Sequence, residues 1–384
     1  MNQDIRVLHI CKNIPIPGFP ENNIILQQIE AQNESGMLTK IFYPREIIPS
    51  ILKYMGGRAQ AIININDNFI SEGFNISCIN YIRLPTSYLE WILSSKLNFY
   101  LNKSLANTIK KFSPQIIHAH YIFPDALIAH AISKRYKIPY VISIREGDYF
   151  NFNKNRNNIQ LARKTIEQSS KIIGITPNLL RAKFLHNSKE IVYNFIHNDF
   201  FSPVEKFSEK KKNHITIIAK GIKRKNIDWV VQYVSNHKDS TSLSVIGSGK
   251  VIQKLKNKFY SYNNIEFLGK ISRPEVIKQL DKSEIFALPS NNETFGMVYA
   301  EAAARGNIVV GLEGTGLSGI NCKSFYFAKN EQDFISLMDE ITNYSFEKKL
   351  ELSKLSRESA ILFSKDIYID KIRQIYNDVI TMSS

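Results

Sequence analysis

The 384-residue sequence has little cysteine and no long apolar run. Its three cysteines are odd in number and far apart, at Cys11, Cys78 and Cys322. They cannot form a disulfide framework or a zinc ribbon within one chain, so a reducing compartment is the simplest interpretation. No run of 18 apolar residues is free of charge, which argues against a membrane-spanning helix. The first eleven residues carry charged side chains and do not form a signal-peptide core. We therefore expect a cytoplasmic protein or one at the cytoplasmic face of the inner membrane.

Acidic residues are also scarce relative to basic ones. The chain has 50 Lys and Arg against 35 Asp and Glu, a formal net charge of +15 and a pI near 9.4. Such a surplus favours polyanionic partners, whether nucleic acid, an anionic bilayer or a phosphorylated substrate. The sequence contains no helix-turn-helix, zinc-finger or aromatic RNA-binding motif, so we expect no nucleic-acid partner.

Glycine and proline number only 17 and 13, and 43% of the residues are hydrophobic, which excludes a collagen-like or disordered chain. The length predicts two or three domains. Continuous runs rich in Val and Ile alternate with amphipathic stretches, begin again after about residue 210, and are typical of parallel strands buried on both faces. This pattern predicts two doubly wound α/β domains, 1–203 and 204–365. The Lys-rich segment Phe200–Asn213 is interpreted as a solvated linker, and Gly56–Asp67 as a loop with an irregular continuation.

The most informative segment is Leu288–Gly306 (LPSNNETFGMVYAEAAARG). It follows an apolar run and opens an Ala-rich helix, with Glu293 in the loop and Glu301 in the helix, where both can address one elongated ligand. Backbone amides at a helix start form an anion site, and a glycine there lets a phosphate approach closely. The amides concerned are those of Phe295, Gly296, Met297 and Val298. The alternative is a helix-dipole carboxylate plus an exposed helical glutamate.

A second candidate phosphate site is Ile218–Asp228 (IAKGIKRKNID). Cations clustered at the carboxyl end of a strand face the crevice where ligands bind in open α/β sheets. Here Lys220 and Lys225 are the candidates, whereas Lys223 and Arg224 are expected to point to solvent. The alternative is a solvated basic turn.

The segment NETFGMVYAEAAARG resembles the signature of glycosyltransferase family 4, the retaining "glycosyl transferases group 1" enzymes of the GT-B fold. Leu243–Gly249 (LSVIGSG) and 265–288 match the family in order and spacing, and the resemblance covers most of residues 215–345. It implies two doubly wound Rossmann-like domains facing across a cleft. By analogy, the helix 366–384 packs back on the N-terminal domain.

The resemblance also implies roles for the site residues. Glu293 would contact hydroxyls of the donor sugar, Glu301 the ribose hydroxyls, and the amides of 295–298 the diphosphate. Gly247 and Ile271 would line the nucleotide side, and we expect Glu293 and Lys225 to reach one bound molecule. The family places Arg and Lys five positions apart to neutralise the leaving diphosphate; Lys220 and Lys225 keep the spacing, but Lys220 replaces the arginine.

The N-terminal half resembles the family less closely. Many relatives have a histidine where this chain has Arg145, which cannot shuttle a proton but can bind phosphate or carboxylate. We expect Arg145 to orient the donor or an anionic acceptor and Asp148 to contact a sugar hydroxyl. An ion pair of Arg145 with Glu146 or Asp148 is the alternative. His118 and His120 are expected to line the acceptor site or to be structural, with no metal between them.

In the loop Pro15–Asn23 relatives often have two glycines, and this chain has only Gly18, which would lie by the donor.

The resemblance implies a retaining, metal-independent transferase without a cofactor. Its donor would be a UDP- or GDP-sugar. The +15 charge fits an acceptor that is a glycan or an undecaprenyl-diphosphate-linked saccharide of bacterial surface polysaccharide synthesis, such as capsule, O-antigen or lipopolysaccharide, and predicts an anionic inner-membrane surface as a further partner. The alternative is an inactive relative that binds sugar nucleotide or glycan as a scaffold.

Overall fold

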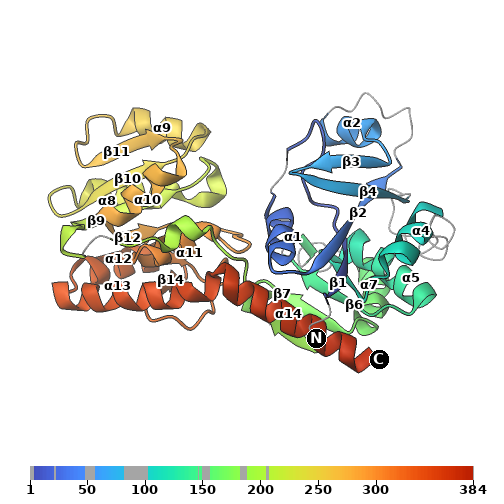
Figure 1. Ribbon diagram of the computed structural model, residues 1–384. Coiled ribbons are helices and arrows are strands. Elements are labelled where there is room, and N and C mark those ends of the chain that lie inside the picture. Colours follow the sequence, from blue (N-terminus) through green and yellow to red (C-terminus); the bar gives the residue numbers. More distant parts are fainter. Residues whose placement is uncertain are drawn as a thin grey trace. The chain divides into compact units, whose positions relative to one another are not determined.

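The computed structural model describes residues 4–20, 23–47, 57–81, 103–145, 147–148, 156–181, 188–204 and 207–383. Two compact units can be separated: residues Met1–Tyr193 with Ile369–Ser384 form unit 1, and Asn194–Tyr368 form unit 2 (Figure 1). Each unit is built around one mainly parallel sheet with helices against it, which confirms the predicted α/β class. Within the described ranges, no helix combines the length and the apolar character needed to cross a membrane.

Unit 1 contains an eight-stranded sheet in the order β3-β4-β2-β1-β5-β6-β7-β8, in which only β3 and β4 pair antiparallel. Its strands are β1 (Arg6–Ile10), β2 (Leu38–Glu46), β3 (Asn68–Ser71), β4 (Phe74–Tyr81), β5 (Ile116–Ala119), β6 (Tyr140–Ile144), β7 (Lys171–Gly174) and β8 (Lys189–Ile191). Its helices are α1 (Ile24–Glu34), α2 (Gly57–Asn64), α4 (Lys103–Phe112), α5 (Leu127–Tyr136), α7 (Arg156–Glu167) and most of α14 (Lys365–Ser383).

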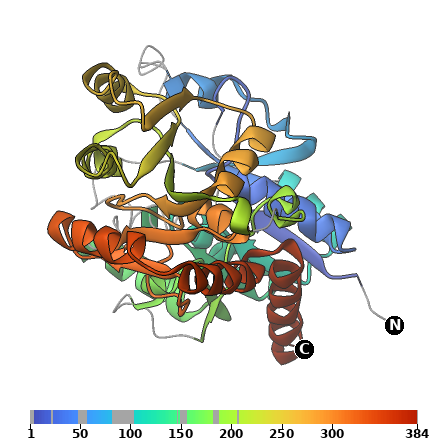
Figure 2. The same ribbon diagram turned by 90° about the vertical axis from the view of Figure 1, so that its left-hand side faces the viewer.

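The two faces of this sheet bury different side chains because strand residues alternate. Leu8 and Ile10 of β1 belong to a core with residues of α4, α5 and α7, whereas Ile41 and Tyr43 of β2 belong to a second core with residues of α1 and α2. Helix α14, red in both views (Figure 1, Figure 2), contributes the buried Tyr376 to unit 1, where its hydroxyl lies 3.3 Å from Gln32 Oε1 of α1.

Unit 2 contains a six-stranded parallel sheet in the order β11-β10-β9-β12-β13-β14. Its strands are β9 (Lys211–Ile218), β10 (Ser242–Ile246), β11 (Ile265–Gly269), β12 (Ser283–Ala287), β13 (Ile308–Leu312) and β14 (Phe325–Ala328). Its helices are α8 (Ile227–Asn236), α9 (Lys250–Lys258), α10 (Arg273–Lys282), α11 (Met297–Ala304), α12 (Glu331–Thr342) and α13 (Phe346–Ala360). Strands β10, β12 and β13 are buried along their whole length, as expected for strands covered on both faces.

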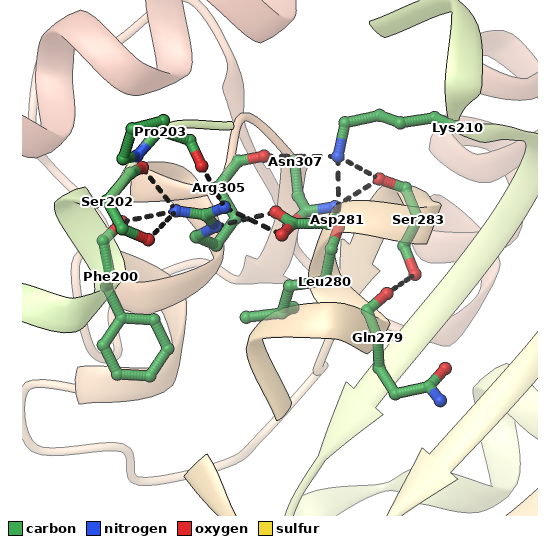
Figure 3. Close-up of polar contacts among 10 residues, drawn as sticks. All are labelled: Phe200, Ser202, Pro203, Lys210, Gln279, Leu280, Asp281, Ser283, Arg305 and Asn307. Carbon is green, nitrogen blue, oxygen red and sulfur yellow. Dashed lines mark hydrogen bonds and ion pairs between the residues drawn. The ribbon is translucent and has the colours of Figure 1, made fainter. Parts of the chain in front are cut away.

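The first unit ends at Tyr193, whereas the sequence placed the boundary at residue 203. Arg305 holds the last of the intervening residues, 200–203, to unit 2 (Figure 3). Its guanidinium forms two 2.7 Å hydrogen bonds with Asp281 and also donates to the carbonyl oxygens of Phe200, Ser202 and Pro203. This buried arginine therefore fastens the start of the expected linker to unit 2.

The prediction of a solvated linker is wrong for Lys210. Its side chain is buried, and Nζ donates to the carbonyl oxygens of Leu280, Ser283 and Arg305 at 3.0, 2.8 and 3.2 Å (Figure 3). Burial lowers the pKa of Lys210 to about 7. The sequence does not show which lysine of this run turns inward, because the acceptors of Lys210 lie 70 or more residues away along the chain.

The expected loop over Gly56–Asp67 is also wrong, because residues 57–64 form α2. Ala61 and Ile62 are buried in the core that contains Phe69 of β3 and Tyr43 of β2. This short helix is stabilised by tertiary packing, which outweighs the weak helical preference of a segment that begins with glycine.

Candidate active site

Each sheet changes strand order at one point, and that point predicts a ligand crevice. In unit 2 the chain passes from β9 outward to β10 and β11, and then returns to β12 on the other side of β9. In unit 1 the corresponding point lies between β1 and β5. In open α/β sheets, ligands bind outside the carboxyl ends of the strands at such switch points.

At the switch point of unit 2, Lys225 and Glu293 form an ion pair. Lys225 follows β9 and Glu293 follows β12, and the Lys225 Nζ contacts Glu293 Oε2. Ser290 Oγ donates to the same carboxylate oxygen at 3.0 Å. The structure thus brings together two residues that the sequence nominated from separate motifs.

Arg224 differs from the expectation that it points only to solvent. It is half-exposed, yet Nη1 donates to the carbonyl oxygen of Asn292 at 3.0 Å and lies 3.9 Å from Glu293 Oε2. Its own carbonyl oxygen accepts from the Asn291 amide at 2.7 Å. Arg224 therefore fastens the β9 loop to the β12 loop. Lys223 is exposed, as expected.

Helix α11 starts beside this pair. Gly296 precedes its first residue with φ +75°, and a Cβ there would come within 2.3 Å of the Tyr299 ring. The adjacent amides of Met297 and Val298 are the first of the helix and have no carbonyl four residues back within it. Phe295 is buried. These amides and the positive end of the helix dipole favour an anion at this point.

The loops after β9 and β10 are in direct backbone contact, which only glycine permits. A Cβ on Gly247 would lie 1.9 Å from the carbonyl oxygen of Ala219, and one on Gly249 would lie 2.6 Å from that of Gly221. The Gly247 amide in turn donates to the Gly269 carbonyl oxygen at 2.7 Å. Three successive strand ends are therefore fixed relative to one another along the same edge.

Three other residues that the sequence nominated lie in unit 2 without forming part of the ion pair. Lys220 is exposed after β9, and its Nζ bonds to no described residue. Ile271 is half-buried in the loop after β11. Glu301 lies in α11 on the turn after Met297, and burial raises the pKa of its carboxyl group to about 7 although Arg273 opposes that shift. No described residue hydrogen-bonds to the Glu301 carboxyl group.

Beside the switch point of unit 1, Arg145 follows β6, the strand next to β5, and is 6% exposed. Its Nη2 donates to Gln28 Oε1 of α1 at 3.0 Å, and its guanidinium lies 5.8 Å from the centre of the Tyr121 ring. The expected alternative, an ion pair with Asp148, is not formed, and Glu146 lies outside the described residues.

Asp148 makes backbone contacts that the sequence did not predict. Its carboxyl oxygens accept hydrogen bonds from the backbone amides of Arg145 and Ile122 at 3.2 and 3.0 Å. Burial raises its pKa to about 7 although these bonds oppose the shift. Asp148 thus holds the turn that carries Arg145, and its contact with a sugar hydroxyl stays a prediction.

Gly18 adopts φ +78° in a tight turn closed by paired hydrogen bonds between Ile16 and Phe19. A proline at Pro17 followed by a glycine with positive φ is the pattern of a type II turn. The turn belongs to the loop after β1, at the carboxyl end of that strand.

His118 and His120 are buried inside unit 1 together with His9, which the sequence did not nominate. His118 contacts Tyr376 Oη at 2.6 Å and Ser143 Oγ at 2.7 Å, and His9 Nδ1 lies 3.0 Å from His120 Nε2. Burial lowers the pKa of all three, that of His9 to about 3. Their contacts with one another, with Ser143 and with Tyr376 all lie within unit 1, which favours the structural one of the two roles expected for His118 and His120.

Three clustered imidazoles raise the question of a metal ion. One nitrogen of each ring lies within 4.8 Å of the others. However, the His118 and His120 rings stack with centroids 4.3 Å apart and planes 17° apart. A cation binds in the plane of each imidazole, so one ion cannot satisfy both stacked rings, and the donor set does not fit a metal.

Residues found only in the structure are Ser290, Gln28, His9 and Tyr376. His9 lies in β1 and His118 in β5, and the register of these two neighbouring strands places His9 beside His118. Had the pairing of β1 with β5 been predicted, this contact could have been predicted too. Gln28 of α1 and Tyr376 of α14 have no corresponding signal in the sequence.

Two family models match the chain. "Glycosyl transferases group 1" matches residues 199–358, and "Glycosyl transferase 4-like" matches residues 61–176, so together they span more than two thirds of it. The chain belongs to the group 1, family 4-like glycosyltransferases. Among solved structures, this glycosyltransferase resembles sucrose-phosphate synthase from Thermosynechococcus elongatus with a TM-score of 0.67 at 14% identity, over 98% of this chain and 100% of that one. The fold is therefore GT-B.

Other similar proteins extend this comparison. Anabaena HepE in complex with UDP and glucose matches with a TM-score of 0.61 at 12% identity, over 97% and 99% of the two chains. An uncharacterized glycosyltransferase of Methanocaldococcus jannaschii is 23% identical over 71% of this chain and 78% of its own. A putative teichuronic acid biosynthesis glycosyltransferase of Bacillus subtilis is 22% identical over 61% of this chain and 62% of its own.

Proposed function

We propose that this glycosyltransferase takes its sugar from a UDP- or GDP-sugar held by unit 2. The observation that carries the proposal is the Lys225–Glu293 pair at the switch point, beside the first amides of α11. Nucleotide-sugar cleavage leaves negative charge on a diphosphate, and preorganised amides and cations stabilise such charge. UDP and glucose in the Anabaena structure support the same donor class.

Each residue then has a distinct task. Glu293 holds a sugar hydroxyl, and its pairing with Lys225 keeps both side chains in place before the donor arrives. Lys225, Lys220 and the amides of residues 295–298 neutralise the diphosphate, so the reaction needs neither a metal nor a cofactor. Glu301 accepts hydrogen bonds from the ribose, and Gly247 and Ile271 border the nucleotide.

Transfer proceeds with retention of the anomeric configuration. Glu293, the carboxylate of the ion pair, is already engaged by Lys225 and Ser290 and is assigned to the donor sugar, so we assign no covalent nucleophile. This favours front-face attack assisted by the departing phosphate. NMR of the glycosidic product tests this step, and an inverted anomeric centre would disprove it.

The acceptor is a glycan or a lipid-linked saccharide such as an undecaprenyl-diphosphate sugar, in bacterial surface polysaccharide synthesis. The Bacillus subtilis relative, with its teichuronic acid assignment, supports that class. The +15 charge supports a place at the cytoplasmic face of the anionic inner membrane.

A donor screen followed by one substitution tests the proposal. Ligands that bind only the folded state raise Tm, so a panel of UDP- and GDP-sugars identifies the donor. Glu293→Gln should then lower kcat/KM about 100- to 1000-fold, the size of effect that follows the loss of one preorganised active-site group, because glutamine cannot form the ion pair that positions Lys225. Glu313→Gln, in the exposed loop after β13, is the matched control and should leave kcat/KM unchanged. A protein that raises its Tm with a sugar nucleotide but never transfers the sugar would be the scaffold instead.

A further inference from the structure

Arg145 is a buried arginine that lacks acceptors for most of its donors. A guanidinium has five N–H groups. Here one hydrogen bond, from Nη2 to Gln28, is formed, while Nε has no partner and is shielded from solvent. Among the described residues no carboxylate lies within ion-pair distance of the guanidinium.

The nearby carboxyl groups do not balance this charge. Asp125 is fully buried, and burial raises its pKa well above the usual value even though Arg145 opposes the shift. Asp148 uses both oxygens for backbone amides. A buried charge without a counter-charge costs several kcal/mol of folding free energy, so the residue is poorly explained as a stabilising element.

The position of Arg145 indicates what the group is for. It follows β6, next to β5, and packs on Tyr121, which follows β5. Gln28 belongs to α1, the helix that follows β1. Arg145 therefore lies with the ends of β1 and β5, beside the switch point where a doubly wound sheet binds ligands.

We propose that unit 1 has an oxyanion site built on the free N–H groups of Arg145, and that the acceptor carries a carboxylate or phosphate group that occupies it. The second clause rests on the proposed function; the first does not. A guanidinium fork matches the paired oxygens of either group. Gln28 fixes the orientation of the fork, and the Tyr121 ring favours the cation from one side. The donor diphosphate has its own cations and amides in unit 2, so a second anion site points to a second substrate.

The first experiment observes Arg145 directly in the full-length protein. Its Nε–H NMR signal, assigned by its loss in Arg145→Lys, is followed while succinate, inorganic phosphate or sodium chloride is added at matched ionic strength. We expect a saturable shift with succinate, phosphate or both, and none with chloride. Succinate alone indicates a carboxylate acceptor, and phosphate alone a phosphorylated one. An equal response to chloride, or no response to any salt, would overturn the site.

The second experiment separates a ligand-binding arginine from a structural one. Without an anion, Arg145→Met should leave Tm unchanged or raise it. The variant should also abolish the rise in Tm that succinate or phosphate causes in the unchanged protein. Arg45→Met is the matched control, because each of the three guanidinium nitrogens of Arg45, in β2 of the same unit, donates to an acceptor: Asn80, the Ile65 carbonyl oxygen and Asp67. That control should lower Tm while the Arg145 signal still responds. If Arg145→Met lowers Tm as much as Arg45→Met does, the proposal is wrong.

The signal of Arg145 also distinguishes this proposal from the proposed function. It should respond to the anion in Glu293→Gln as it does in the unchanged protein, because Glu293 belongs to unit 2. If the Arg145 signal responds but no sugar nucleotide binds, the oxyanion site is supported and the proposed donor is wrong. If a sugar nucleotide binds but the signal does not respond, the donor is supported and the oxyanion site is wrong.

Discussion

Glu301 is partly desolvated in α11 and lacks a protein hydrogen-bond partner among the described residues, so its charge depends on pH near neutrality. Its folded pKa of about 7 lies above the usual value near 4.5. Its contribution to stability is therefore complete below about pH 4.5 and is lost as the pH rises through 7. A ligand whose hydroxyls donate to the carboxylate has the opposite preference, because it binds the ionised form.

Donor affinity should accordingly fall about tenfold between pH 8 and pH 6, since one pH unit below a pKa of 7 reduces the ionised fraction about tenfold. Glu301→Gln should remove this slope, because the amide is neutral throughout. Isothermal titration with the sugar nucleotide checks both results, with Glu266→Gln on the exposed side of β11 as the control. A slope that persists in Glu301→Gln would assign the titration to another group.

Single residues also show where sequence reasoning succeeds. Lys225 and Glu293 were nominated because each lies in a short motif at a strand end, and parallel strands bring those ends to one edge. The partner of Arg145 was not predictable, because Gln28 lies 117 residues away on a helix face with no distinguishing pattern. Burial of Lys210 was missed for the same reason: its acceptors are backbone carbonyls, which every residue has.

At the scale of elements, α14 joins unit 1 through polar as well as apolar contacts. Ile372, Ile375 and Val379 are buried, and Tyr376 lies 2.6 Å from His118. The spacing of Ile372, Ile375 and Val379 puts them on one helical face and can be recognised from the sequence, whereas the polar partner required the structure.

Tyr376→Phe should lower the free energy of unfolding by about 1–3 kcal/mol, because His118 and Gln32 each lose a partner in a buried site. Chemical denaturation followed by a probe in unit 1 measures the change. Tyr260→Phe, on an 85% exposed side chain, should change nothing. An equal loss in both variants would mean that the buried hydroxyl has no special role.

In unit 2, Arg305 joins separate segments of the chain in a similar way, through Asp281 and the carbonyl oxygens of residues 200, 202 and 203 (Figure 3). Arg305→Lys should cost about 3–5 kcal/mol of unfolding free energy, because lysine cannot form the fork with Asp281 and leaves that buried carboxylate partly unpaired.

Arg273→Lys provides a matched exposed pair. Arg273 lies 3.4 Å from Asp199, with about half of both side chains exposed, so its loss should cost at most about 1 kcal/mol. Urea unfolding of both variants makes the comparison; similar losses would contradict the structural weight given to Arg305.

At the scale of the whole molecule, the surplus of 15 positive charges should bind the chain to anionic vesicles. We expect sedimentation with phosphatidylglycerol vesicles at low salt, none with phosphatidylcholine, and release at about 0.5 M salt, where screening is strong. Recovery in the soluble fraction at low salt would remove the membrane from the proposed function.

A charge-matched pair of variants locates the contact. Lys110→Glu with Lys111→Glu alters the last turn of α4 in unit 1, and Lys254→Glu with Lys256→Glu alters α9 in unit 2. Residues 1–203 carry the larger net charge, +9 against +6 for residues 204–384, so we expect the larger loss for the first pair. Equal losses would mean that only net charge matters.

The chain leaves unit 1 at Tyr193 and re-enters it at Ile369. During synthesis on a ribosome, unit 2 can therefore fold once residue 368 has emerged, whereas the older unit 1 must wait for its last helix. Until then the face of the sheet that carries His9, His118 and His120 lacks Tyr376 and remains uncovered by α14.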